Sequence, residues 1–128
     1  MWEPDPTDEF ERKLKWFARK RPRETQAVLD NLATYLQSLK SGAKPQHRPF
    51  GFMHSEGRGV WAIDQKGGGK NLVQTRLYAY PDAGKEILHL ITIGDKGSQQ
   101  EDIKTCNVLV AILKASESTQ NEPDKSGE

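Results

Sequence analysis

Hydrophobic residues recur at helical spacing in two neighbouring segments near the N-terminus. In residues 7–20 the apolar positions lie four and three apart, at Phe10, Leu14 and Phe17. Residues 22–40 continue this spacing through Val28, Leu32, Tyr35, Leu36 and Leu39. Thr7 is a suitable N-cap for the first helix, and Pro22 can both end it and begin the second. The pattern predicts two amphipathic helices joined by a short link, which pack as an antiparallel pair.

The middle of the chain changes to the alternation and the turn residues that are typical of β-strands. We expect strands over residues 59–64, 71–80 and 85–93, and a short one near Phe50. Alternation divides the strand at 71–80 into two faces. The face expected to lie against the helices carries Val73, Thr75, Leu77 and Ala79. The opposite face carries Leu72, Gln74, Arg76, Tyr78 and Tyr80.

Helical spacing returns at residues 98–114, where Ser98 and Glu101 have the pattern of a capping box. After this segment no apolar residue larger than alanine follows. We therefore expect an α+β domain over residues 1–114, with an N-terminal helical hairpin packed on a three- to four-stranded antiparallel sheet and a C-terminal helix. Residues 115–128 are expected to form a disordered acidic tail.

Length and composition narrow the class of protein further. The chain has 128 residues, of which 34% are hydrophobic and 29% charged, so one domain with a modest core is expected. It has no apolar run near the roughly 20 residues that span a bilayer, and its acidic, proline-containing start is unlike a signal peptide. The lone Cys106 excludes an internal disulfide and suits the reducing cytoplasm. The three histidines are scattered, so we expect neither a metal site nor another cofactor.

The formal net charge of +1 is unevenly distributed. Residues 115–128 carry a net charge of −3, which leaves about +4 on residues 1–114. Seven basic residues and no acidic one occur between Arg12 and Arg23. A basic body favours a polyanionic partner or an acidic binding protein, although a solvated helix face would explain the excess equally well.

Three basic residues are candidates for phosphate chemistry. Arg76, with Tyr78 and Tyr80 on the same strand face, can bind a phosphate while the rings stack on bases. The alternative is that Arg76 pairs with an acidic neighbour and the tyrosines belong to an ordinary sheet. Lys96 follows the last strand at a helix N-terminus, which is a natural anion site, or it is a plain turn lysine. His54 lies beside glycines and can transfer protons near neutral pH, or it is an ordinary surface histidine.

The order of these parts resembles the RelE/ParE superfamily of bacterial toxins from toxin–antitoxin pairs, over about residues 8–114. The resemblance is sharpest in "GVWAID", "TRLYAYPD" and "ILHLITIGDKGSQQEDI". These stretches look like the family's strand with an arginine before an aromatic residue, followed by a hydrophobic strand that ends in a glycine and a basic residue.

The resemblance implies a toxin that acts as a metal-independent, ribosome-dependent mRNA endoribonuclease and arrests translation. Its partners would be a cognate antitoxin, mRNA and the ribosome, all in the cytoplasm. Arg76 and Lys96 would then stabilise the pentavalent phosphate, His54 would transfer protons, and Tyr78 or Tyr80 would stack on a base. This interpretation requires that Arg76 project from an uncovered face of the sheet and not be held in an internal carboxylate pair.

Three positions depart from the family pattern and keep other functions open. RelE presents paired lysines on the strand that "GVWAID" replaces, and this strand has no lysine. Asp64 at its end would repel phosphate. Lys66 and Lys70 in the flexible hairpin loop could substitute for the missing lysines. The family's C-terminal tyrosine falls near Ile103, which cannot transfer protons. One alternative is a ParE-like inhibitor of DNA gyrase. The other is a noncatalytic protein-binding module of the same fold.

Overall fold

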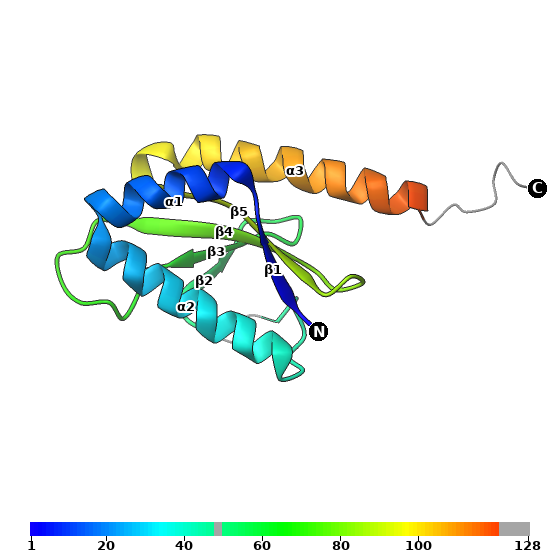
Figure 1. The fold of residues 1–128 in the computed structure, drawn as a ribbon, viewed down its shortest axis with the longest axis horizontal. Helices are drawn as coiled ribbons and strands as arrows, with labels where there is room; N and C mark the ends of the chain where they lie inside the picture. The colour runs from blue at the N-terminus through cyan, green and yellow to red at the C-terminus, as the bar shows by residue number, and fades with distance from the viewer. Residues whose placement is uncertain (48–49, 121–128) are drawn as a thin grey trace, which may run out of the picture.

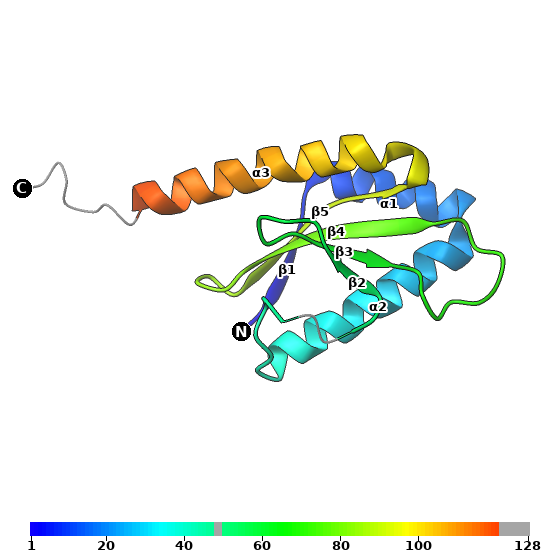
Figure 2. The same ribbon diagram turned by 180° about the vertical axis from the view of Figure 1, so that it is seen from behind.

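A five-stranded mixed sheet lies between helices on both of its sides (Figures 1 and 2). The computed structural model describes residues 1–47 and 50–120. In chain order the elements are β1 (Glu3–Pro6), α1 (Asp8–Lys20), α2 (Pro22–Lys40), β2 (Met53–Ser55), β3 (Trp61–Asp64), β4 (Thr75–Asp82), β5 (Ile87–Asp95), η1 (Lys96–Ser98) and α3 (Gln99–Gln120). The strand order is β1-β5-β4-β3-β2, with β1 parallel to β5 and the other neighbours antiparallel. The α+β class is confirmed, whereas the purely antiparallel sheet of three or four strands is wrong in detail.

The two N-terminal helices begin and end where their sequence signals predicted. Thr7 caps α1, because its Oγ1 accepts a hydrogen bond from the backbone N–H of Phe10 at 2.9 Å. Pro22 occupies the first turn of α2. Gly42, with φ of +104°, supplies the left-handed conformation just after that helix. The two predicted helices are therefore present, but β1 precedes them, so the helix-first arrangement that was expected is wrong in detail.

The larger hydrophobic core lies between the sheet and the α1–α2 hairpin. Leu77 and Ala79 of β4 belong to it, as the alternation predicted. The helices contribute Phe10, Phe17, Val28, Leu32, Tyr35 and Leu39. Removal of these side chains from water is the main force that holds the hairpin against the sheet.

β1 precedes the helices and was not predicted, because two of its four residues are prolines. An edge strand tolerates proline where the missing N–H would point away from the neighbouring strand. The N–H groups of Glu3 and Thr7 donate to the carbonyl oxygens of Glu86 and Leu90, each at 3.0 Å. The prolines occupy alternating positions between these donors, so the pairing with β5 loses nothing to them.

α3 covers the face of the sheet opposite to α2 (Figures 1 and 2). Cys106 and Val110 on α3 pack against Ala62, Tyr78 and Ile91 on the sheet. Both faces of the central strands are consequently buried. The expectation that the Tyr78 face is open is wrong, because the apolar stripe of α3 needs a surface to cover it and this face is apolar enough to serve.

The start and the end of α3 also differ from the sequence prediction. The capping box joins Asp95 and Ser98, each side chain bonding the other's backbone N–H at 3.2 Å, and it begins the short turn η1. At its other end α3 continues through residues 115–120, which were expected in the tail. Extension of an existing helix costs little, so the helix outlasts its apolar stripe. Residues 121–128 of the expected tail lie outside the described part of the chain.

A buried carboxylate ties the start of α3 to α1 and β5. Asp102 is 1% exposed, and it accepts hydrogen bonds from Lys13 Nζ at 2.9 Å and from Ser98 Oγ at 2.7 Å. Lys13 also donates to Thr92 Oγ1 at 3.1 Å. Gly94 of β5 leaves room for this arrangement, because a Cβ there would overlap the carboxylate of Asp102.

Gly94→Ala should lower the free energy of unfolding by about 1–3 kcal/mol, since the added methyl group must displace Asp102 or the backbone. Urea unfolding followed by circular dichroism measures the change. The matched control is Gly84→Ala in the β4–β5 hairpin, where an added Cβ would lie 3.6 Å from its nearest neighbour, Asp82 Oδ1. A loss at Gly94 no larger than that at Gly84 would contradict the close packing around Asp102.

Candidate functional site

The aromatic platform expected around Arg76 does not form an open surface. Tyr78 is only 1% exposed beneath α3, and burial raises the pKa of its hydroxyl above the ordinary value. The ring packs with Cys106, and burial raises the pKa of that thiol to about 12. With α3 in place, Tyr78 is part of the core and has no face free to stack on a base.

Arg76 is also less open than the nuclease interpretation requires. Its Nη1 lies 3.4 Å from Oε2 of Glu56, and the two side chains are 22% and 15% exposed. This ion pair is the alternative that the sequence left open. The contact is long for a charge-assisted hydrogen bond. In addition, Nε of Arg76 is buried and has no hydrogen-bond partner among the described residues. Arg76 therefore keeps donor capacity that Glu56 does not use.

His54 of β2 and Asp64 of β3 form a close pair on the same side of the sheet as Arg76. His54 Nε2 lies 2.6 Å from Asp64 Oδ2, and Asp64 Oδ1 accepts the backbone N–H of Lys66 at 2.7 Å. An Nε2–H group of His54 can donate to this carboxylate, and in the tautomer that does so Nδ1 is the other ring nitrogen, free of that contact. The side chain of His54 is 37% exposed, so it remains accessible.

Asp64 lies beside Arg76 in the sheet. It is the partner of Arg76 in the antiparallel register of β3 and β4. Directly opposite residues point to the same face of a sheet and lie about 5 Å apart. Asp64 was expected to repel phosphate, and its carboxylate instead has two partners in the structure, His54 Nε2 and the backbone N–H of Lys66.

Lys96 is not brought together with His54. It begins η1 at the end of β5, and its side chain is exposed. Two strands, β4 and β3, separate β5 from β2 in the sheet, which corresponds to roughly 14 Å. Arg76 on β4 lies between the two: Asp64, the partner of His54, faces it from β3, and Gly94, two residues before Lys96, faces it from β5.

The hairpin loop with Lys66 and Lys70 is anchored to α2. Asn31 Nδ2 donates to the carbonyl oxygen of Lys66 at 3.0 Å, and Arg23 Nη2 donates to that of Lys70 at 3.2 Å. Side chains of α2 thus hold two backbone carbonyls of the loop that the sequence analysis expected to be flexible. Both lysine side chains are exposed.

Tyr80 lies at the other end of the same face and is half-buried. Its ring stacks on that of His89, with centroids 6.1 Å apart and planes at 26°. His89 is 9% exposed, and desolvation lowers its pKa below the ordinary value of 6.5, against the opposing effect of Asp5. His89 is therefore largely buried, and its Nε2 has no hydrogen-bond partner among the described residues.

Sequence reasoning missed Glu56 and the partnership of His54 with Asp64. A strand was expected near Phe50, whereas β2 begins at Met53. In the register of the β2–β3 hairpin His54 is directly opposite Ala62, and Asp64 is two residues further along β3 on the same face. Because this register was not predicted, the contact between His54 and Asp64 could not be inferred. The polar residues on both sides of the glycine-rich turn at 57–59 were the available signal.

Comparisons with protein-family models, with curated proteins and with solved structures find no match for this chain. Within residues 1–47 and 50–120, no group of three or more His, Cys, Asp or Glu side chains is arranged to hold a metal ion. None of the helices in that part of the chain is long and apolar enough to cross a membrane. The family resemblance therefore rests on motifs and on the order of elements.

His89→Gln should flatten the dependence of stability on pH between about pH 7 and 5. Because the folded pKa of His89 is lowered, the unfolded chain binds more protons in this range, and stability falls as the pH drops below about 6.5. Urea unfolding at several pH values measures the slope. His47→Gln, at an exposed histidine, is the control. An unchanged slope in the His89 variant would show that His89 is not kept neutral by burial.

Proposed function

We propose that this chain is the toxin of a toxin–antitoxin pair of the RelE/ParE type, and that it cleaves mRNA on the ribosome without a metal ion. The motifs around Arg76 and the order of the helices and strands support the family. The contact of 2.6 Å between His54 and Asp64 carries the chemistry. The reactive site is then the part of β2 and β3 that carries His54 and Asp64, and the buried Tyr78 has no part in it.

His54 is suited to act as the general base. Its Nδ1 would take the proton of a ribose 2′-hydroxyl while the 2′-oxygen attacks the adjacent phosphorus. The bond from phosphorus to the 5′-oxygen of the next nucleotide breaks, and this oxygen takes a proton from solvent. The products are a 2′,3′-cyclic phosphate and a 5′-hydroxyl. Asp64 would hold the ring in its orientation and stabilise the imidazolium that forms.

Arg76 is suited to bind the reacting phosphate. Glu56 contacts Nη1 at 3.4 Å, which is long for a charge-assisted hydrogen bond, and the Arg76 side chain is 22% exposed. Phosphate oxygens match the fork of a guanidinium group, so a bound phosphate would take the place of Glu56. The charge of Arg76 would then stabilise the charge that develops on the phosphate oxygens.

The partners follow from the charge and from the size of this site. The His54–Asp64 pair and Arg76 offer little surface for an RNA strand, so presentation of mRNA by the ribosome would supply what the chain lacks. The basic surface of α1, which includes the exposed Arg12, Lys15, Arg19 and Lys20, suits an acidic segment of an antitoxin in the cytoplasm.

Two observations favour a noncatalytic alternative. Tyr78 is covered by α3, and Arg76 is engaged by Glu56, so the face lacks the open arrangement that the nuclease interpretation first required. A ParE-like inhibitor of gyrase, or a protein-binding module, needs neither an acid nor a base. The half-exposed His54–Asp64 pair is what favours cleavage over these functions.

His54→Ala should lower the rate of mRNA cleavage in a translation extract by about 100-fold or more, because it removes the general base. Gel analysis of end-labelled mRNA measures the rate. His47→Ala, at an exposed histidine outside the site, should keep the wild-type rate. Intact mRNA with loss of gyrase supercoiling would instead favour the ParE-like function. Intact mRNA, active gyrase and unimpaired growth would favour the binding module.

Glu56→Gln and Arg76→Ala should change cleavage in opposite directions. Removal of the Glu56 charge frees Arg76 for phosphate, so the KM for RNA should fall. Removal of the guanidinium should lower kcat/KM by on the order of 100-fold. Steady-state kinetics on the same mRNA measure both variants. A rise of KM in Glu56→Gln would show that Glu56 positions Arg76 and does not compete with phosphate.

A further inference from the structure

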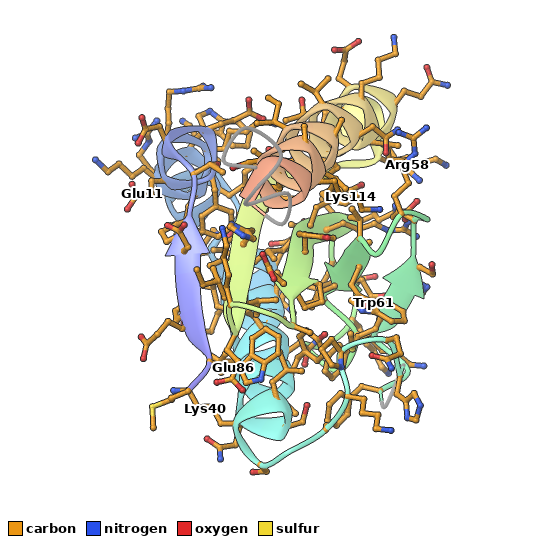
Figure 3. The ribbon with its side chains drawn as sticks, turned by 90° about the vertical axis from the view of Figure 1, so that its right-hand side faces the viewer. Glu11, Lys40, Arg58, Trp61, Glu86 and Lys114 are labelled. Atoms are coloured by element: carbon orange, nitrogen blue, oxygen red, sulfur yellow. The ribbon has the colours of Figure 1, made fainter. Side chains whose placement is uncertain are left out.

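A cleft of about 500 Å³ opens beside the end of β4, away from the His54–Asp64 pair. Three elements form its walls. Arg58 belongs to the turn between β2 and β3, Tyr80 belongs to β4, and Lys114 belongs to α3. Trp61 and Pro45 close it from the other side. Figure 3 faces this part of the molecule and labels Arg58, Trp61 and Lys114.

The cleft is positively charged. Arg58 and Lys114 line it, and no acidic residue does so among the described residues. Arg58 has φ of +56°, in the left-handed region that side chains rarely adopt. The turn is fixed in this form by hydrogen bonds between Val60 N–H and the Gly57 carbonyl at 3.0 Å, and between Glu56 N–H and the Val60 carbonyl at 2.9 Å. The fold thus holds an unfavourable backbone conformation at the residue that presents a cation to the cleft.

The aromatic walls are held in place by their neighbours. The ring of Tyr80 stacks on His89, and a Cβ placed on Gly59 would lie 3.0 Å from its Cε1. Trp61 Nε1 donates to the carbonyl oxygen of Pro45 at 2.9 Å. Rigid rings lose little entropy on binding, so they suit a flat aromatic ligand. Two cations next to such rings match a base that carries a phosphate.

We infer that this cleft binds one nucleotide of an RNA strand, with its phosphate between Arg58 and Lys114 and its base against Tyr80. The choice of RNA rests on the proposed function, whereas the site itself contains none of the residues assigned to cleavage. Ser55 lines the cleft and directly follows His54 in β2. A nucleotide bound here would therefore set which phosphate of the strand reaches the His54–Asp64 pair.

The test is binding of a fluorescein-labelled oligoribonucleotide of six residues to the chain with His54→Ala, followed by anisotropy at several salt concentrations. Adding Arg58→Ala and Lys114→Ala should weaken binding by about tenfold or more. It should also lower the slope of log affinity against log salt by about 0.7, the value for one phosphate of a single strand that is no longer neutralised. Arg12→Ala with Lys15→Ala removes the same charge from α1 and is the control.

The further arms separate the possible outcomes. Tyr80→Leu should weaken binding of the oligoribonucleotide and of free adenosine monophosphate, but leave binding of pyrophosphate unchanged. The inference would be overturned if Arg58→Ala with Lys114→Ala weakened binding no more than Arg12→Ala with Lys15→Ala. It would also be overturned if the cleft bound pyrophosphate as well as the nucleotide and Tyr80→Leu had no effect on either. A second result is that the chain cleaves no mRNA while its cleft variants still lose binding of the oligoribonucleotide. That pair of results would support the cleft as a binding site and refute only the proposed function. If the cleft variants cleave mRNA at the wild-type rate and at the same positions, the proposed function would be supported and the cleft inference refuted.

Discussion

The buried carboxylate of Asp102 determines which parts of the sheet are covered. Lys13 and Ser98 donate to its two oxygens, and Gly94 makes room for it on β5. These contacts fix the first turn of α3 against α1 and β5, and the helix then runs over the central strands (Figure 1). Removal of one partner of a buried ion pair is strongly destabilising, so the loss of Lys13 would leave the buried Asp102 without its cation.

The position of α3 determines which polar side chains of the sheet are buried and which are exposed. Under the helix, Tyr78 becomes a core residue, and Arg76 is left at the boundary between the core and solvent. Beyond its edge, His54 and Asp64 form a close pair whose side chains are 37% and 17% exposed. Near its other end, α3 places Lys114 over the cleft that Arg58 and Tyr80 also line. One helix thus closes the middle of the sheet and leaves two smaller polar sites at its sides.

The local part of this structure could be predicted from the sequence, and the long-range part could not. Helical periodicity and caps located α1 and α2, and alternation assigned Leu77 and Tyr78 to opposite faces, because both signals depend on near neighbours. β1 depends on a partner more than 80 residues away and is disguised by its prolines. The covering of Tyr78 depends on where α3 docks, and that in turn depends on a buried ion pair between residues 13 and 102. The His54–Asp64 contact likewise depends on a hairpin register that composition does not reveal.

The chemical ends of the RNA fragments test the central claim most directly. Attack by a 2′-hydroxyl that is activated by His54 must leave a 2′,3′-cyclic phosphate, or the 3′-phosphate formed by its hydrolysis, on one fragment and a 5′-hydroxyl on the other. Mass spectrometry of fragments from a translation extract that contains the purified chain distinguishes these ends. The account predicts cyclic phosphate and 5′-hydroxyl ends. Fragments with 3′-hydroxyl and 5′-phosphate ends, or no fragments at all, would contradict it.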